Sequence, residues 1–175
     1  MAAVNVRHEL ALDRVLLVVA NHPWQKSDRR ITPAADRLAM VRAGVAGTGG
    51  VEASGIEIDR GGDSYTADTL EALAAEDPDR ELFLIVGTDV AAELHTWRRP
   101  EVVARLATLV VVSRGGAPPA APGPPWRVAH VRIPALEVSS SDLRARAAEG
   151  RPLDHLVPAP VIACIRERGL YARAR

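Results

Sequence analysis

Three short segments of the chain are hydrophobic at consecutive positions rather than at alternate ones. They cover residues 15–20, 82–86 and 109–112. Uninterrupted apolar runs of this length are typical of strands buried on both faces, which occur mainly in parallel sheets. A weaker strand is predicted over residues 51–58 and a further strand over residues 127–133. The pattern therefore predicts a parallel sheet that is covered on both sides.

Amphipathic helical patterns lie between these strands. Thr32 is the expected N-cap of a first helix, because residues 33–45 begin with proline and carry apolar side chains at spacings of three and four. A second helix is predicted over residues 66–76, and two more are expected after residue 133. Strands that alternate with helices predict an α/β fold with a doubly wound parallel sheet, whose ligands bind at the carboxyl ends of the strands.

Composition narrows the class of protein further. The 175 residues carry 22 basic and 22 acidic side chains, and 47% of the residues are hydrophobic. These values predict one globular domain over residues 1–175. A net charge of zero argues against a nucleic-acid or membrane-surface binder, because such partners attract basic proteins. With no signal peptide, no membrane span and a single cysteine, Cys164, expected to be buried, we expect a cytoplasmic protein.

Residues 115–125 hold five of the 13 prolines. Proline is excluded from helix interiors and central strands, so this segment is predicted to be an extended Pro/Gly-rich surface loop within the domain. The histidines outside the first loop share no metal-ligand spacing and no pair of cysteines is present, so no metal site is predicted. No catalytic triad or carboxylate pair is recognisable either.

Unusual polar residues follow the predicted strands. The first strand runs into residues 21–26, which include Asn21, Trp24 and Lys26, the only lysine beside 21 arginines. Amide, indole and ammonium groups can all contact a nucleotide. The alternative is a solvated loop in which Trp24 covers the sheet edge.

The second strand ends at Gly87, and Asp89 and Trp97 follow. Glycine permits close approach of a ligand, and a carboxylate at a strand end can accept hydrogen bonds from ribose hydroxyls. Trp97 could stack on a heteroaromatic ring or simply pack in the core. The third strand ends just before Arg114, which could pair with a phosphate, although plain solvation is the alternative for it and for the Arg98-Arg99 pair.

Three serines, Ser139 to Ser141, open a predicted helix with Arg144 expected on its first turn. Their hydroxyls, the free backbone amides and the helix dipole favour an anion. Capping needs only one serine, so the cluster favours phosphate binding. The turn at residues 63–66 also leads into a helix, where amides could hold a carboxylate, but capping explains it nearly as well.

In their order along the chain these motifs resemble the bacterial nicotinate mononucleotide adenylyltransferase family of the nucleotidyltransferase superfamily, in its actinobacterial form. The resemblance runs from about Asn5 to Tyr171, through Pro23-Trp24-Gln25-Lys26, Asp59-Arg60-Gly61-Gly62, Tyr65-Thr66-Ala67-Asp68-Thr69-Leu70, Gly87-Thr88-Asp89 with Trp97, Val112-Ser113-Arg114 and Ser139-Ser140-Ser141-Asp142-Leu143-Arg144. It implies a Rossmann-like nucleotidyltransferase fold. It also implies transfer of an adenylyl group from ATP, with Mg²⁺, to nicotinate mononucleotide, giving deamido-NAD and pyrophosphate.

The resemblance implies two sets of binding residues. Those for nicotinate mononucleotide are Asn21, Lys26, Thr66, Trp97, Arg98 and Arg114, and those for ATP are Gly87, Asp89, Ser139, Ser140 and Arg144. In the family, an indole at the position of Trp97 stacks on the pyridine ring, and backbone amides near Thr66 and Arg98 hold the carboxylate. No protein nucleophile is implied, because the substrate phosphate itself attacks.

The chain departs from the family at its start. The family opens with a strand and a Gly-Gly-Thr-Phe-Asp-Pro-x-His-x-Gly-His turn, and Met1 falls just after the last histidine of that turn. One strand with its turn, roughly 20 residues, is therefore expected to be missing, and a start codon placed too late is the favoured explanation. We expect a damaged core and little or no activity from the chain as it stands.

The sequence leaves other functions open. Another adenylyltransferase of the superfamily would act on nicotinamide mononucleotide or phosphopantetheine. A non-catalytic nucleotide-binding remnant is the alternative from a different class. A homo-oligomer also remains open.

Overall fold

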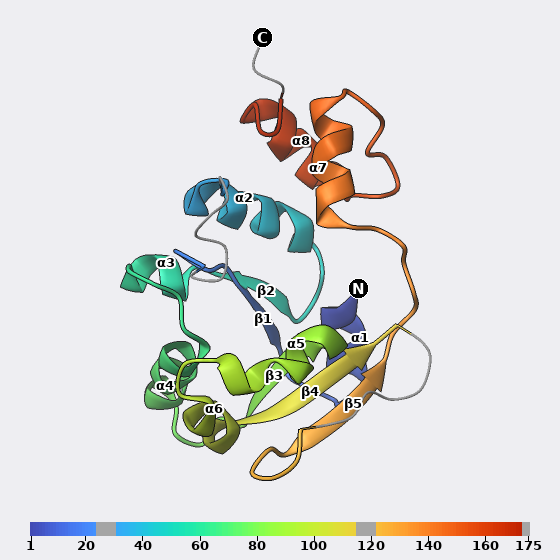
Figure 1. Ribbon diagram of the computed structural model, residues 1–175. Helices are drawn as coiled ribbons and strands as arrows, with labels where there is room; N and C mark the ends of the chain where they lie inside the picture. Colours follow the sequence, from blue (N-terminus) through green and yellow to red (C-terminus); the bar gives the residue numbers. More distant parts are fainter. Residues whose placement is uncertain (24–30, 115–121, 173–175) are drawn as a thin grey trace. The chain divides into compact units, whose positions relative to one another are not determined.

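The computed structural model describes residues 1–23, 31–114 and 122–172, which form an α/β fold (Figure 1). The elements in chain order are α1 (Ala2–Glu9), β1 (Val15–Val18), α2 (Ala34–Val45), β2 (Val51–Ser54), α3 (Ile56–Arg60), α4 (Thr66–Glu76), β3 (Leu82–Gly87), α5 (Thr88–Ala92), the short 3₁₀ helix η2 (Leu94–Thr96), α6 (Pro100–Leu106), β4 (Ala107–Ser113), β5 (Val128–Arg132), α7 (Ser140–Ala148) and α8 (Ala159–Glu167). They divide into two compact units. Unit 1 is Met1–Val15 with Asp63–Ala135, and unit 2 is Leu16–Gly62 with Leu136–Arg175.

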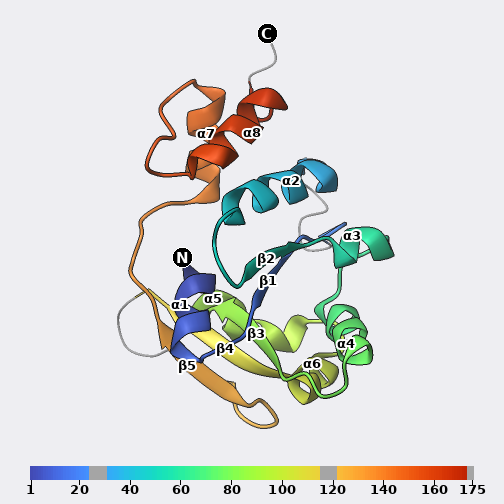
Figure 2. The same cartoon turned by 180° about the vertical axis from the view of Figure 1, so that it is seen from behind.

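Unit 1 contains a three-stranded sheet in the order β3-β4-β5. Both strand pairs are parallel, as predicted, with Gly87 opposite Val112 and Val112 opposite Val131. The helices α5 and α6 pack on β4, and α1 packs on β5 (Figure 2). Strands β3 and β4 arise from two of the apolar runs, and β5 lies within the further strand predicted over residues 127–133.

The central strand β4 explains why its sequence is apolar without interruption. Leu109 and Val111 pack in one cluster with Leu94, whereas Val110 between them packs in another cluster with Val6. Successive side chains of a strand point to opposite faces, so each face of β4 needs its own apolar residues. Val6 belongs to helix α1, which therefore contributes to the core on this face of β4.

Unit 2 contains β2 and all of β1 except Val15, and these two strands form a two-stranded sheet. The Val19 N–H donates to the Ser54 carbonyl at 3.0 Å just beyond β1. Helix α2 packs on β2 and on α8, and the guanidinium of Arg168 donates to the Asp36 carboxylate at 2.6 Å. Cys164 of α8 is buried, which fits the expectation of an inert thiol.

Two predicted boundaries are wrong. The strand predicted over residues 51–58 ends at Ser54, because the Ser54 hydroxyl accepts the Ile56 N–H at 3.3 Å and helix α3 begins there. The predicted N-cap Thr32 does not cap α2. That helix starts at Ala34, extended Pro33 takes the cap position, and the Thr32 hydroxyl instead donates to the Tyr171 hydroxyl at 3.3 Å.

Two other predictions are tested only in part or not at all. Of the Pro/Gly-rich segment 115–125, residues 122–125 contain no helix or strand, and residues 115–121 lie outside the description. The single domain over residues 1–175 stays a prediction, since each unit is compact by itself. None of the described helices has the length and apolar character that a membrane crossing needs.

Candidate functional site

The predicted site residues fall into both units. Unit 1 holds Thr66, Gly87, Asp89, Trp97, Arg98 and Arg114, and unit 2 holds Asn21, Ser139, Ser140 and Arg144. Lys26 lies outside the described residues, together with Trp24 and Gln25.

The carboxyl edge of the unit 1 sheet carries three predicted residues. Gly87 ends β3 opposite Val112, so Asp89 and Arg114 each follow two residues after a paired position on the same sheet edge. Both side chains are exposed. A Cβ at Gly87 would meet nothing within 4 Å, so the strand end is open to a ligand. The sheet therefore brings these residues to the edge where α/β folds bind ligands.

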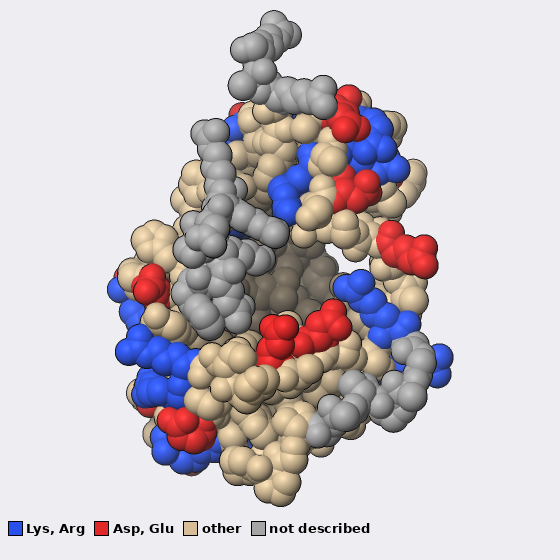
Figure 3. Space-filling model, viewed as in Figure 1, with Lys and Arg blue, Asp and Glu red and all other residues tan. Residues whose placement is uncertain are grey.

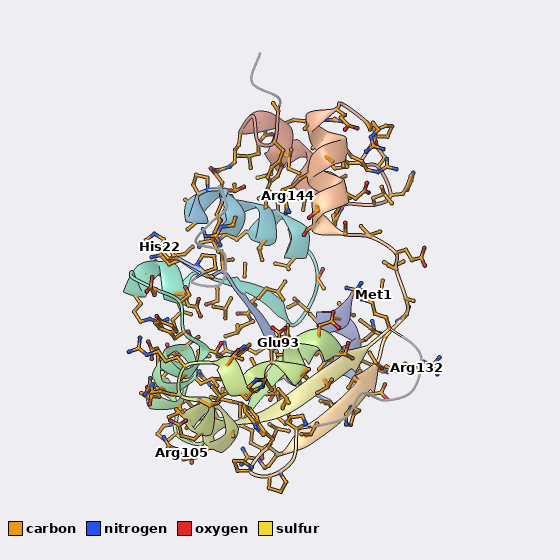
Figure 4. All side chains as sticks on the ribbon, viewed as in Figure 1. Met1, His22, Glu93, Arg105, Arg132 and Arg144 are labelled. Carbon is orange, nitrogen blue, oxygen red and sulfur yellow. The ribbon has the colours of Figure 1, made fainter. Side chains whose placement is uncertain are left out.

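Acidic side chains are exposed over α5 (Figure 3). Asp89 lies in the first turn of this helix, and Glu93 follows its last residue and is labelled in Figure 4. The Thr88 hydroxyl donates to Asp89 at 3.4 Å. Carboxylates suit ribose hydroxyls or a phosphate-bound cation better than a bare phosphate. Among the described residues, no group of three or more His, Cys, Asp or Glu side chains could hold a metal by itself.

Trp97 follows η2 and is partly buried. Its indole packs against the cluster that contains Val86, Ala91 and Leu94. These residues belong to the end of β3, to α5 and to η2, so the ring is supported by the same elements that present Asp89. Packing and stacking, which the sequence left as alternatives, are compatible here because part of the indole stays accessible.

Arg98 lies beside the turn that leads into α4. Its guanidinium carbon is 4.4 Å from the centre of the Tyr65 ring, a cation–π contact. Tyr65 occupies the N-cap position of α4, and its side chain makes no cap hydrogen bond to the first amides of the helix. The structure thus brings Arg98 and Thr66, two predicted binding residues, to one corner of unit 1.

Arg99 joins the same corner, although the sequence could not separate it from a solvated arginine. Its two terminal nitrogens donate to the two carboxylate oxygens of Glu71 at 2.9 and 2.8 Å, and one of them also donates to Asp68. This hydrogen bonding holds the pKa of Glu71 below its usual range and raises the pKa of Arg99. The three-residue spacing of Asp68 and Glu71 on one helix face was the available signal.

The serine cluster of unit 2 is confirmed as a helix start. The Ser139 hydroxyl accepts the Asp142 N–H at 3.0 Å as the N-cap of α7. Arg144 lies in the second turn rather than the first, because α7 begins only at Ser140, and its guanidinium donates to the Ser141 hydroxyl at 3.2 Å. Figure 4 shows Arg144 on this helix. Ser140 is exposed.

Asn21 is held by contacts that the sequence did not indicate. Its side-chain amide donates to the Gly62 carbonyl at 2.9 Å. Arg37 of α2 donates to the Asn21 carbonyl and to the Thr32 carbonyl, both at 2.9 Å. Partial burial lowers the pKa of Arg37. One arginine therefore ties down both ends of the segment that includes Lys26, and nothing in the sequence distinguished it from the other arginines.

Comparison with known proteins shows which proteins this chain is similar to. The family model described as cytidylyltransferase-like matches residues 1–146. A protein of Streptomyces coelicolor named probable nicotinate-nucleotide adenylyltransferase is 42% identical over 172 residues, covering 98% of this chain and 92% of that protein. A protein of the same name from a Nocardioides species is 41% identical over 177 residues and covers 99% and 86% of the two chains.

Solved structures show the same fold. The Plasmodium falciparum nicotinic acid mononucleotide adenylyltransferase complexed with NaAD aligns with a TM-score of 0.71 over 95% of this chain and 90% of that chain. Its sequence identity to this chain is 16%, so the likeness concerns the fold. The Rossmann-like nucleotidyltransferase architecture expected from the sequence is confirmed.

Proposed function

Because the chain belongs to the cytidylyltransferase-like family, we propose that it transfers the adenylyl group of ATP to nicotinate mononucleotide. The observation that carries this proposal is the identity of about 40%, over nearly the whole chain, to relatives named probable nicotinate-nucleotide adenylyltransferase. The neighbour from Plasmodium falciparum was solved with NaAD, which supports the same class of product.

The reaction needs positioning rather than a protein nucleophile. An oxygen of the 5′-phosphate of nicotinate mononucleotide forms a bond to the α-phosphorus of ATP, and the bond from that phosphorus to the bridging oxygen breaks. Pyrophosphate leaves with the bond electrons, and deamido-NAD is formed. Catalysis then depends on in-line alignment of the two phosphates and on neutralising the charge between them. Exposed cations and helix amides are the groups suited to this.

The corner of unit 1 around Tyr65 and Arg98 suits the pyridine end of the substrate. Trp97 offers an accessible indole face for stacking. The nicotinate carboxylate would be held by the amides near Thr66 and by the cation of Arg98, because an N-terminal helix end and a guanidinium both favour an anion. An amide in place of the carboxylate brings its own N–H donors and no charge, so the corner favours the acid.

The remaining candidates suit the phosphates and the ATP. Asn21, Lys26 and Arg114 would contact phosphate, Gly87 and Asp89 the nucleotide, and Ser139, Ser140 and Arg144 the phosphates of ATP. Mg²⁺ is commonly bound by one or two carboxylates together with substrate phosphates, and exposed Asp89 fits that requirement. When bound, the ion would neutralise part of the phosphate charge.

The test is a product assay with matched substrates. The protein is incubated with Mg²⁺, ATP and one acceptor, and deamido-NAD or its analogue and pyrophosphate are quantified by chromatography. Any product formed should appear with nicotinate mononucleotide at a rate at least tenfold above that with nicotinamide mononucleotide, and none should form with phosphopantetheine. A preference for either other acceptor would overturn the proposal. Binding of both substrates without any product would support a nucleotide-binding protein instead.

A further inference from the structure

We propose that Arg99 is a positioning residue, which clamps the Trp97-Arg98 turn onto the first turns of α4 and so preforms the pyridine site. This inference rests on the proposed function for the ligand, but the clamp itself is visible in the free protein. It assigns a role to an arginine that is 37% exposed at its side chain and would otherwise count as a surface residue.

The clamp joins two segments that are far apart in the sequence. Asp68 and Glu71 lie on α4, 31 and 28 residues before Arg99. The contact with Glu71 is bidentate, which fixes the plane of the guanidinium as well as its position. Because Asp68 and Glu71 are three residues apart, they lie on one helix face and can share one guanidinium. Such a contact restrains the backbone on either side of Arg99.

The backbone of Arg99 needs this restraint. The residue has φ 53° and ψ 55°, in the left-handed region that a non-glycine side chain seldom adopts. It comes two residues after Trp97, whose backbone is extended, and leads into α6, whose first residue is Pro100. Unfavourable conformations of this kind persist only where surrounding contacts over-determine them. The two carboxylates of α4 are the contacts that do so here.

The left-handed conformation of Arg99 places the three side chains of this turn against three different partners. Arg99 reaches Asp68 and Glu71, Arg98 stacks on Tyr65 at the N-terminus of the same helix, and Trp97 packs on the cluster at the end of β3. All three side chains of the turn are therefore aimed by one conformation. If the clamp opened, we expect the indole and the Arg98 cation to lose their common orientation.

Charge argues against direct substrate binding by Arg99. The clamp contains one cation and two carboxylates, so its net charge is negative and it would repel the carboxylate and phosphate of the substrate. Its terminal nitrogens already donate to both carboxylates. Arg98, in contrast, contacts the ring of Tyr65. A ring contact does not neutralise the charge of the guanidinium, so this charge can still attract an anion. Arg99 thus acts through its neighbours.

A matched pair of arginines tests the proposal. Arg80 contacts Glu76 at 3.2 Å, Asp77 at 3.9 Å and the Leu73 carbonyl at 3.1 Å, at the opposite end of α4. Arg80→Ala therefore removes similar chemistry from the same helix without touching the turn. Affinities for nicotinate mononucleotide and for ATP are measured by calorimetry on the unmodified chain and on Arg99→Ala, Arg99→Lys and Arg80→Ala.

We expect Arg99→Ala to weaken nicotinate mononucleotide at least tenfold and to change ATP affinity less than twofold. Arg99→Lys restores the charge but not the two-pronged contact, so a loss of three- to fivefold is expected. Arg80→Ala should bind both ligands normally. Equal losses in Arg99→Ala and Arg80→Ala, equal losses for both ligands, or no loss in Arg99→Ala would overturn the proposal.

Two further measurements keep the test decisive. If Arg99→Ala does not fold, Glu71→Gln serves in its place, because it removes the charge of one clamp partner and should cost two- to threefold in nicotinate mononucleotide affinity alone. If the unmodified chain binds no nicotinate mononucleotide, the proposed function fails. The indole N–H resonance of Trp97 in the ligand-free protein then still reports on the clamp, and it should move in Arg99→Ala but not in Arg80→Ala. An unmoved resonance would refute the clamp.

Discussion

In unit 1 the candidate residues lie on elements that pack around a fully buried apolar core. In unit 2 the candidate residues are held largely by hydrogen bonds. Among the described residues, the largest side chains that are less than 2% exposed all belong to unit 1; they are Leu94, Leu109, Val6, Val103, Val110, Val111 and Val131. In unit 2 the buried Leu38 and Ile162 are 9% and 5% exposed. Helix α7, which carries the serine cluster, has no buried residue at all.

The difference in apolar burial between the two units predicts a difference in local stability. Free energies of local opening rise with the amount of buried apolar contact, so the elements of unit 2 are expected to open more readily than β3, β4 and β5. The anchors differ in kind as well. Arg99 of unit 1 binds carboxylates, whereas Arg37 of unit 2 binds backbone carbonyls. The proposed pyridine site is therefore anchored by an ion pair above a well-packed core. In unit 2, by contrast, the anchoring hydrogen bonds go to the neutral backbone carbonyls of Asn21 and Thr32.

The largest predicted effect is the loss of unfolding free energy when a buried leucine in either unit is replaced by alanine. Leu109→Ala should lower the free energy of unfolding by about 4 kcal/mol, because Leu109 is almost completely buried in unit 1, and Leu38→Ala by about 2 kcal/mol. Urea denaturation gives both values, and hydrogen exchange should show slower exchange in β4 than in β2. Equal losses in the two variants, or faster exchange in β4, would contradict the comparison.

A smaller loss is expected when the anchor of unit 2 is removed. Arg37→Ala leaves the carbonyls of Asn21 and Thr32 without their charged donor, which should cost about 2 kcal/mol of unfolding free energy. Arg42→Ala is the matched control, since Arg42 is an exposed arginine of the same helix, and its cost should stay within about 0.5 kcal/mol. Urea midpoints at unchanged slope measure both. A similar cost for the two variants would show that Arg37 is not an anchor.

Capping and phosphate binding can be separated at Ser139. Ser139→Ala should cost about 1 kcal/mol of stability because the Asp142 N–H loses its acceptor. Ser139→Asp keeps an N-cap acceptor and so should keep the stability, but its charge should weaken ATP binding at least fivefold. Thermal melts and ATP titrations give the two readouts. ATP affinity that is unchanged in Ser139→Asp would remove the serine cluster from the proposed ATP site.

The smallest predicted effect is a difference in pH dependence between the Arg99 contacts and the Arg37 contacts. The contact with Arg99 lowers the pKa of Glu71 in the folded protein, so its stabilising contribution is complete above the usual glutamate value of 4.5 and is lost as the pH falls through the folded value. The difference in melting temperature between the unmodified chain and Glu71→Gln should therefore be constant from pH 8 to pH 6 and shrink below pH 4.5.

The matching measurement on unit 2 should be flat. The acceptors of Arg37 are backbone carbonyls, which do not titrate, so the effect of Arg37→Ala on the melting temperature should not follow the same acid profile. High salt provides an independent check, because it screens the exposed ion pair of Arg99 with Glu71. If both variants responded alike to acid and salt, the distinction between an ionic and a neutral anchor would fail.

Much of the fold could be predicted because burial leaves its pattern in the sequence. The runs ending at Gly87 and Ser113 became parallel strands, and the serines became a helix cap at Ser139, since apolarity on both faces and capping are local properties. The boundary at Ser54 was missed because a side-chain hydrogen bond to Ile56 overrode the apolar pattern. Thr32 was misjudged because its hydroxyl found a partner in Tyr171, 139 residues away.

The site divides in the same way. The order of the motifs predicted Thr66, Trp97, Arg98 and the strand ends as binding residues, because each of these residue types has a chemistry that the sequence alone indicates. Arg37 and Arg99 could not be singled out among 21 arginines, since an arginine becomes an anchor only through its acceptors. Those acceptors are backbone carbonyls in one case and carboxylates on another helix in the other.

By itself the sequence determined the α/β class, the parallel pairing, the family resemblance and the residue types available for nucleotide chemistry, because each of these depends on local pattern or on order along the chain. Only the tertiary structure decided which arginine stacks on Tyr65, which one clamps α4 and which one ties the ends of the segment from Asn21 to Thr32. The physical reason is that charge and hydrogen-bonding capacity are written in the residue, whereas the partner that uses them is brought near only by folding.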